Sequence, residues 1–375
     1  MKRVFRFFLI SLGLLMLVGC TSPDDAQSAP RSKKITVMKE AVTGTFFSNQ
    51  TVMPYEAVME NFQSFVEWFD TDTVLFLTQQ DETSRIYKYD LFTGKKALFY
   101  SSKAPITQVD SNYSHSYFAI QTVHRNQEKS LIVLNDKGKE AFSWRGFAEG
   151  LQTIWNPYQQ EKVLVSMILK DWQFSVYETD VQTGHMAELN VANPFVQWVN
   201  RQTLAYLNWN QQEPDFSAPL YLVDIPTQQE TKALENVYAA FSFSGVMLAI
   251  SADGPKQQFV DFTFYQSESF QPVASLKAPV LQTFSEQMWI PQHVYDRTER
   301  TFYYMKATYP GDISSYDGKF ELTSFSLEDE QEKKVREFER NVPLKISPGG
   351  TWCLIGNRYE EIINLKTGKV FSLLL

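Results

Sequence analysis

The sequence predicts an all-β fold, a β-propeller of four-stranded blades that follows an export segment. Three observations lead to this prediction. Strands ending in Asp or Asn recur with a period near 40 to 45 residues, strands that mostly carry tryptophan recur with the same period, and an apolar segment opens the chain. Alternating strands repeated with this period are typical of propeller blades.

The first 20 residues have the pattern of a bacterial export signal. Lys2, Arg3 and Arg6 precede an apolar run that ends in Leu17-Val18-Gly19-Cys20. A positive segment, an apolar segment and a small residue before the cut are the features that a signal peptidase requires. We therefore predict a signal peptide over residues 1–19.

Cys20 is the predicted lipidation site, because its thiolate is the nucleophile that takes a diacylglyceryl group. Two acyl chains anchor a protein stably where one is marginal, so we expect a protein held on the extracytoplasmic face of the cell membrane. The alternative is an uncleaved membrane helix, but the apolar run is short for the roughly 20 residues that spanning requires. Residues 20–34 are predicted to be the lipidated start and a flexible tether, and residues 35–375 the propeller.

Composition narrows the possible functions. The net charge is -8 and the isoelectric point is near 5.2, which argues against binding to nucleic acid or to an anionic lipid surface. Contact with the membrane is expected to come from the lipid anchor. Once Cys20 is modified, only Cys353 remains, so the exported chain has no intramolecular disulfide. Stability must therefore come from the core.

The repeat is clearest in a strand that ends in an aromatic or aliphatic residue and then a polar marker, followed by a turn. Clear copies are 86–95, 131–139, 176–184, 220–227 and 361–369, and weaker ones lie at 264–266 and 325–327. The seven markers are Asp90, Asn135, Asp180, Asp224, Gln266, Ser326 and Asn364. Their spacing predicts seven blades. A two-sheet sandwich or two smaller β domains are the alternatives, although neither has a reason to keep this period.

A second marker lies upstream of the first in each unit. Residues 66–75 parallel 196–205, and Ile154-Trp155-Asn156-Pro157 has the same phase. Later copies are 241–245 and 346–352. Each is predicted to be an inner strand followed by a turn and a second strand, which gives four strands per unit with the later hairpin. Such units close around an axis and protect their edges.

The recurring polar and aromatic residues have structural explanations. In the hairpins, the marker side chain is expected to accept backbone N–H groups of its own turn, with Gly94, Gly184 and Gly368 at positive φ. Four tryptophans recur in register and are expected to pack between blades rather than to bind ligand: Trp68, Trp155, Trp198 and Trp352.

The lipidation pattern, the Tyr-Asp-x-x-Thr-Gly hairpin type and Ser347-Pro348-Gly349-Gly350-Thr351-Trp352 resemble the blade motifs of TolB-like propellers. The whole mature chain resembles the YqgU-like propeller lipoproteins of Gram-positive bacteria. This resemblance implies six blades and an extracytoplasmic location, and it carries over no catalytic residue. The count of seven units differs from six, so either a terminal unit is incomplete or a weak middle unit is not a separate blade.

Two long loops are the candidate binding surface. Both combine carboxylates with aromatic side chains and exceed the length that turns require, and function is often carried on such loops. The candidate residues are Trp209, Glu213 and Asp215 in residues 208–216, and Tyr309, Asp312 and Asp317 in residues 308–318. A third loop, Lys170-Asp171-Trp172, is a further candidate for the same face. Two solvated surface loops are the alternative.

Motifs for metals, cofactors and nucleophiles are not apparent. The four histidines, at positions 115, 124, 185 and 293, lack metal-ligand spacing and are expected to be exposed in or beside loops. The sequence has no nucleophile elbow, phosphate loop or calcium loop, and Cys353 is expected to be an inert core thiol. No cofactor or metal is indicated.

Two functions remain. The absence of a catalytic constellation favours a non-catalytic binding or scaffold lipoprotein for an extracytoplasmic protein, peptide or envelope glycan. The alternative is a hydrolase or lyase of envelope polysaccharide, with two of the loop carboxylates as acid and base.

Overall fold

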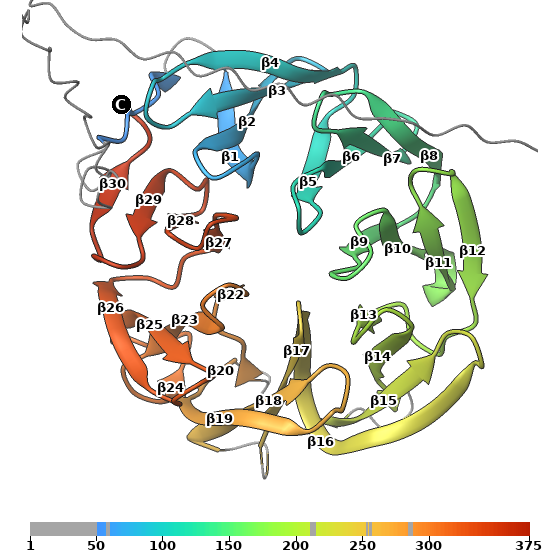
Figure 1. Cartoon of the computed structure of the whole chain (residues 1–375), viewed down its shortest axis with the longest axis vertical. Coiled ribbons are helices and arrows are strands. Elements are labelled where there is room, and N and C mark those ends of the chain that lie inside the picture. The colour runs from blue at the N-terminus through green and yellow to red at the C-terminus, as the bar shows by residue number, and fades with distance from the viewer. Residues whose placement is uncertain (1–50, 58–60, 211–214, 253, 255–256, 284–287) are drawn as a thin grey trace, which may run out of the picture. The chain divides into compact units, whose positions relative to one another are not determined.

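The computed structural model describes residues 51–57, 61–210, 215–252, 254, 257–283 and 288–375. Within these residues, seven four-stranded antiparallel units stand around a common axis (Figure 1). We number them blades 1 to 7 in chain order. The predicted propeller is therefore confirmed, and the described residues contain the seven units that the internal repeat predicts rather than six.

The first three blades are regular, each with its strands in chain order from the axis outward. Blade 1 has β1 (Phe62–Trp68), β2 (Thr73–Gln80), β3 (Thr83–Asp90) and β4 (Lys96–Ser102). Blade 2 has β5 (Ile106–Ser111), β6 (Tyr117–Val123), β7 (Glu128–Asn135) and β8 (Glu140–Phe147). Blade 3 has β9 (Gly150–Trp155), β10 (Lys162–Ile168), β11 (Phe174–Asp180) and β12 (His185–Leu189), with the 3-10 helix η3 (Lys170–Trp172) between its middle strands.

Blades 4 and 5 share one long strand, β16 (Gln229–Phe243), which pairs with β15 through its first half and with β17 through its second. Blade 4 has β13 (Gln197–Trp198), β14 (Thr203–Leu207), β15 (Ala218–Asp224) and the first half of β16. Blade 5 has the second half of β16, β17 (Val246–Ser251), β18 (Phe259–Gln266) and β19 (Pro272–Pro279). Because of this shared strand, the weak middle unit is still a complete blade.

The last two blades complete the ring. Blade 6 has β22 (His293–Asp296), β23 (Thr301–Ala307), β25 (Phe320–Ser326) and β26 (Glu332–Phe338). Blade 7 has β27 (Leu344–Ile346), β28 (Trp352–Ile355), β29 (Glu361–Asn364) and β30 (Val370–Ser372). A small sheet of β20 (Leu281–Gln282), β21 (Met288–Trp289) and β24 (Gly311–Asp312) joins the entry to blade 6 with a loop of the same blade. These extra segments account for the long step between markers 266 and 326.

Each of the seven polar markers ends the third strand of its blade, as the repeat predicts. The Asp90 carboxylate accepts the N–H groups of Phe92 (3.0 Å) and Thr93 (2.8 Å), and Gly94 has a φ of 67°. Asp180 and Asn364 accept the corresponding N–H groups of their own turns. The markers therefore have the turn role that was expected of them.

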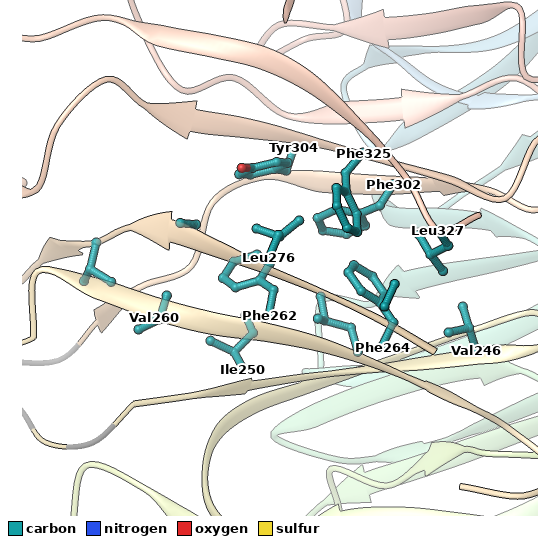
Figure 2. Close-up of a cluster of buried hydrophobic side chains, with 14 of the residues drawn as sticks. Val246, Ile250, Val260, Phe262, Phe264, Leu276, Phe302, Tyr304, Phe325 and Leu327 are labelled. Atoms are coloured by element: carbon teal, nitrogen blue, oxygen red, sulfur yellow. The ribbon is translucent and has the colours of Figure 1, made fainter. Parts of the chain in front are cut away.

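The core lies between neighbouring blades. Figure 2 shows one such layer, in which Val246, Ile250, Phe262 and Phe264 of blade 5 face Phe302 of blade 6, and all five are buried. Each blade covers the face of the next with aliphatic and aromatic side chains, and burial of this apolar surface is the main source of stability. Seven clusters of this kind follow one another around the ring in the described residues.

The four recurring tryptophans have the packing role that was expected. Trp68, Trp155 and Trp198 end inner strands and are 0%, 5% and 1% exposed. Trp352 is half-buried between Phe92 of blade 1 and Phe371 of its own blade, but it begins the second strand of blade 7 and so departs from the predicted register. The Pro-Gly-Gly turn before it shifts the tryptophan out of register with the other three.

Blades 7 and 1 close the ring, although each takes its four strands from one end of the chain. The guanidinium of Arg358 donates to the carbonyls of Phe62 (3.0 Å) and Gln63 (2.5 Å). Tyr55, ahead of blade 1, pairs with Leu374 beyond the last strand. The two ends are therefore fastened by backbone contacts.

Candidate functional site in the axial cavity

The predicted binding loops lie on one face of the propeller. Residues 208–217 join β14 to β15, residues 308–319 join β23 to β25, and η3 joins β10 to β11. All are connections between second and third strands, and because the strands of a blade are antiparallel these connections share a face, which we call the loop face. Turns between first and second strands, such as 112–116, lie on the opposite face, the turn face.

The first predicted loop contributes one residue to a cavity. Trp209 is 37% exposed and lines a cavity of about 270 Å³ with Phe195 and Tyr238. The exposed carboxylate of Asp215 accepts the N–H of Phe216 at 2.7 Å. Glu213 lies outside the described residues.

In the second predicted loop the carboxylates organise their own turns. Asp312 accepts the N–H (2.8 Å) and the hydroxyl (2.5 Å) of Ser314, and these bonds hold its pKa below the ordinary value. The hydroxyl of Tyr309 donates to Asp317, and this bond raises the pKa of Tyr309 to about 12. A glycosidase acid needs a raised carboxyl pKa, so Asp312 is shifted in the wrong direction for that role.

A larger cavity of about 390 Å³ lies on the axis at its turn-face end. Its walls come from the inner strands β1, β5, β16, β22 and β27 and from the turns that follow β5, β22 and β27. None of the five predicted binding residues that the structure describes lines this cavity. Its polar lining includes Glu67, Asp110, Tyr113, His115, Arg297 and Lys345.

Lys345 joins three blades at one side of the cavity. Its ammonium lies 2.9 Å from a carboxylate oxygen of Glu67 and 3.8 Å from one of Asp110, and it donates to the carbonyl of Val66 at 2.9 Å. Glu67 in turn accepts the N–H groups of Trp68 (2.8 Å) and Ser111 (3.1 Å). Glu67 and Lys345 are therefore held in place by contacts within the wall.

The two carboxylates have different surroundings. Burial, assisted by the nearby charge of Glu67, raises the pKa of Asp110 although Lys345 opposes the shift. Burial alone would lower the pKa of Lys345, but the charges of Glu67 and Asp110 raise it above its ordinary value, so Lys345 is a cation at neutral pH. The side chain of Asp110 is 32% exposed against 7% for Glu67. Asp110 therefore presents the more accessible carboxylate to the cavity.

The expectation that all four histidines are exposed is wrong for three of them. His185 is exposed and His124 is half-buried against Ser130 (2.8 Å), whereas His115 and His293 line the cavity. Burial lowers the pKa of both cavity histidines, so both rings are neutral at pH 7. They were misplaced because the turn that holds His115 and the inner strand that begins at His293 face other blades instead of open solvent.

Two polar groups of the cavity have no hydrogen-bond partner among the described residues, namely the hydroxyl of Tyr113 and the guanidinium of Arg297. Tyr113 is half-buried, and its burial, together with Tyr158, raises its pKa to about 12 although Arg297 opposes the rise. The charge of Arg297 also reaches His115. The turn of blade 2 and the turn of blade 6 thus meet at the cavity and bring free donors together.

The sequence contains a signal for this site that the repeat analysis did not use. Glu67 in Val66-Glu67-Trp68 occupies the position of Gln197 in Val196-Gln197-Trp198. Blade 1 therefore has a charged side chain where blade 4 has a neutral amide, and this difference indicates that the position has an additional role in blade 1.

In the part of the chain that the structure describes, no group of three or more His, Cys, Asp or Glu side chains is placed to hold a metal ion. No described helix has the length and hydropathy needed to cross a bilayer. Cys353 is fully buried, as expected of a core thiol, and burial raises its pKa to about 12.

Known proteins are similar to this chain along most of its length. The uncharacterized lipoprotein YqgU of Bacillus subtilis is 25% identical over 376 residues, covering 100% of this chain and 98% of its own. The crystal structure of uncharacterized protein lmo1340 from Listeria monocytogenes is similar with a TM-score of 0.78 at 19% identity, covering 87% of this chain and 98% of the other.

More distant structures share the fold alone. The β-propeller domain of the Trilobed protease from Pyrococcus furiosus is similar with a TM-score of 0.56 at 10% identity, covering 84% of this chain and 97% of that domain. The family model described as a YqgU-like 6-bladed beta propeller domain matches residues 90–356. Since this match covers most of the chain, the protein belongs to the YqgU-like β-propeller family.

Proposed function

We propose that this protein is an extracytoplasmic lipoprotein, anchored to the membrane through Cys20, whose propeller is a non-catalytic binding module and whose axial cavity is the binding site. The similarity to a Bacillus subtilis lipoprotein supports the anchor. Cys20 lies outside the described residues, so the anchor is argued from sequence. The ligand is an extracytoplasmic small molecule or an exposed part of a protein, peptide or glycan.

The observation that carries the proposal is the cavity of about 390 Å³ into which Tyr113 and Arg297 bring unpaired polar groups. Ligand cavities combine apolar walls with a few convergent polar groups that are available to a ligand. Phe243 and Tyr295 supply the apolar walls here.

The test is thermal stability of the mature lipoprotein, purified from membranes in detergent, against fractions of the culture medium and envelope below about 1 kDa. A ligand that binds the folded state at 100 times its Kd stabilises it by about 2.7 kcal/mol, so we expect at least one fraction to raise the Tm. The Arg297→Ala and Tyr113→Phe variants should lose that increase. Arg201→Ala, an exposed arginine in a turn of blade 4 on the same face, is the matched control.

The proposal is overturned if no fraction raises the Tm of the parent, or if Arg297→Ala and Arg201→Ala respond alike. A replacement by Ala of the six residues predicted from the sequence, Trp209, Glu213, Asp215, Tyr309, Asp312 and Asp317, tests the predicted loops separately. If only that variant loses the response, the site lies on the loop face. Detergent phase partitioning of a Cys20→Ala variant tests the anchor, which we expect to be lost.

A further inference from the structure

The lining of the axial cavity contains several hydrogen-bond acceptors. Asp110 accepts from the amide of Gln108 through one oxygen, and its other oxygen is 3.8 Å from Lys345, beyond hydrogen-bond distance. Glu67 already accepts two N–H groups and Lys345 and its side chain is 7% exposed, so Asp110, at 32%, is the carboxylate of this cluster more open to a ligand.

The two cavity histidines add acceptors. Nδ1 of His115 lies 3.0 Å from the carbonyl of Trp68, and Nδ1 of His293 lies 2.9 Å from the carbonyl of Pro291. A carbonyl only accepts, so each Nδ1 carries the proton and each Nε2 of the neutral ring is an acceptor. A group with several N–H donors, such as an ammonium, is the natural complement of the Asp110 carboxylate.

The lining of the same cavity also carries hydrogen-bond donors. Arg297 is exposed and has five N–H donors, and the Tyr113 hydroxyl beside it is also unpaired among the described residues. A planar guanidinium binds a carboxylate through two parallel hydrogen bonds. The cavity lining therefore combines a carboxylate from blade 2, Asp110, with an exposed guanidinium from the turn of blade 6, Arg297.

We propose that the axial cavity binds a zwitterion, an amino acid or a short peptide, with its ammonium group at Asp110 and its carboxylate at Arg297. The inference rests on the proposed function, since it names the ligand class of the same site. The volume lies within the range of small-molecule pockets, and Phe243 and Tyr295 offer aromatic walls to an apolar side chain of the ligand. Lys345 and Glu67 form the wall and take no part in binding.

The experiment is calorimetric titration of the detergent-solubilised mature lipoprotein with phenylalanine, alanyl-phenylalanine, the N-acetyl form of this dipeptide and its C-terminal amide. We expect one or both zwitterions to bind, and their relative Kd values distinguish a free amino acid from a peptide. Loss of a charged hydrogen-bond partner costs about 1.5–3 kcal/mol, or roughly 10- to 100-fold in Kd. Acetylation and amidation should therefore each weaken binding at least about 10-fold.

Variants assign each end of the ligand. In Asp110→Asn the penalty for acetylation should shrink while the penalty for amidation remains, and in Arg297→Ala the reverse should hold. Arg201→Ala and Asp136→Asn, which change exposed residues of other turns, are matched controls and should leave all four affinities unchanged. Unchanged circular dichroism and Tm in the absence of ligand show that each variant is folded.

Three results would overturn the inference: equal binding of the neutral derivatives and the zwitterion, penalties that do not follow the variants, or no binding of any of the four probes. In each case the proposed function is judged separately, because the fraction screen identifies a ligand of any class. A Tm increase that depends on Arg297, obtained with a fraction free of amino acids and peptides, would keep the binding module and reject the zwitterion.

Discussion

Blades 1 and 4 are linked to their neighbouring blades by hydrogen bonds from the same strand positions, but through different side chains. In blade 4, the amide oxygen of Gln197 accepts the N–H of Ser242 in blade 5 (2.7 Å), and the indole of Trp198 donates to Ile154 of blade 3 (3.1 Å). In blade 1 the carboxylate of Glu67 accepts the N–H of Ser111 in blade 2, and the indole of Trp68 donates to the carbonyl of Lys345 in blade 7 (2.8 Å).

The charges of Glu67 and Lys345 are not needed for the structural link between neighbouring blades. A neutral glutamine is sufficient to link neighbouring inner strands, so the charge of Glu67 and the cation of Lys345 exceed what the link requires. Buried ion pairs are weak sources of stability. The charged version occurs where the two ends of the chain meet and beside the cavity. We infer that charge is retained there to fix the wall that presents Asp110.

The largest effect is expected from Lys345→Met, which leaves two carboxylates without their cation. Breaking a largely buried ion pair from one side costs about 3–5 kcal/mol, and we expect a loss of this size in urea unfolding at pH 7. The double variant Glu67→Gln with Lys345→Met makes blade 1 resemble blade 4 and should recover at least half of the loss. A double variant as unstable as Lys345→Met would refute the equivalence of Glu67 and Gln197.

A smaller effect is expected from the tryptophans that end the inner strands. Trp68 and Trp198 both donate to a carbonyl of the preceding blade, whereas the buried indole N–H of Trp155 has no hydrogen-bond partner in the described part of the chain. Replacement by Phe removes the donor and some volume, at a cost of about 1–3 kcal/mol when a buried acceptor is left unpaired. We expect Trp155→Phe to cost less than either other replacement.

Urea midpoints of the three Phe variants check this order. A cost for Trp155→Phe equal to the other two would show that lost volume rather than the hydrogen bond sets the effect.

The marker residue of the hairpin turns also occurs in a charged form, Asp90, and in a neutral form, Asn135. Asp90 has a pKa below its ordinary value, because the N–H groups of Thr93 and Phe92 outweigh the opposing effect of burial. Asn135 accepts comparable turn N–H groups without titrating. Asp90→Ala should cost about 0.5–1.5 kcal/mol at pH 7, and Asp90→Asn less.

The sign of the pH dependence follows from the lowered pKa. The contribution of Asp90 is complete above the pKa of the unfolded chain, near 4, and is lost as pH falls through the lower pKa of the folded state. Urea midpoints of the parent and Asp90→Asn should therefore converge between pH 7 and pH 3. A constant gap would mean that the turn bond does not depend on the charge.

The fold was predictable because its repeat is made of local chemistry. A marker such as Asp90 bonds to its own turn two and three residues ahead, so each blade carries the same short pattern regardless of its neighbours. The spacing of the markers predicted the seven units that the described residues contain, whereas the family description has six blades. The repeat placed Trp352 in phase with the tryptophans that end inner strands, but strand pairing puts it at the start of the second strand of blade 7.

The site was not predictable because it depends on closure of the ring. Lys345 and Glu67 are 278 residues apart, and only the meeting of blades 7 and 1 brings them together. The repeat period gives the order of the blades, but it does not tell which residues face the axis. His115 and His293 were therefore expected to be exposed in or beside loops. The long loops drew attention by composition, whereas the axial cavity is built from inner-strand residues of several blades.

The smallest effect is expected from a thiol reagent, which should leave the native protein unmodified. Cys353 pairs with Ile346, next to Lys345, and burial raises its pKa to about 12, so the thiol stays protonated and covered at pH 8. Unfolding in urea should release one reactive thiol, since a lipidated Cys20 has none.

In Lys345→Met the junction of blades 7 and 1 is weakened and should open more often, so Cys353 should be labelled faster. Trp155→Phe should not change the labelling rate. Rapid labelling of the native parent would show instead that blade 7 opens independently of the ion pair, and that Lys345 does not hold the ring closed.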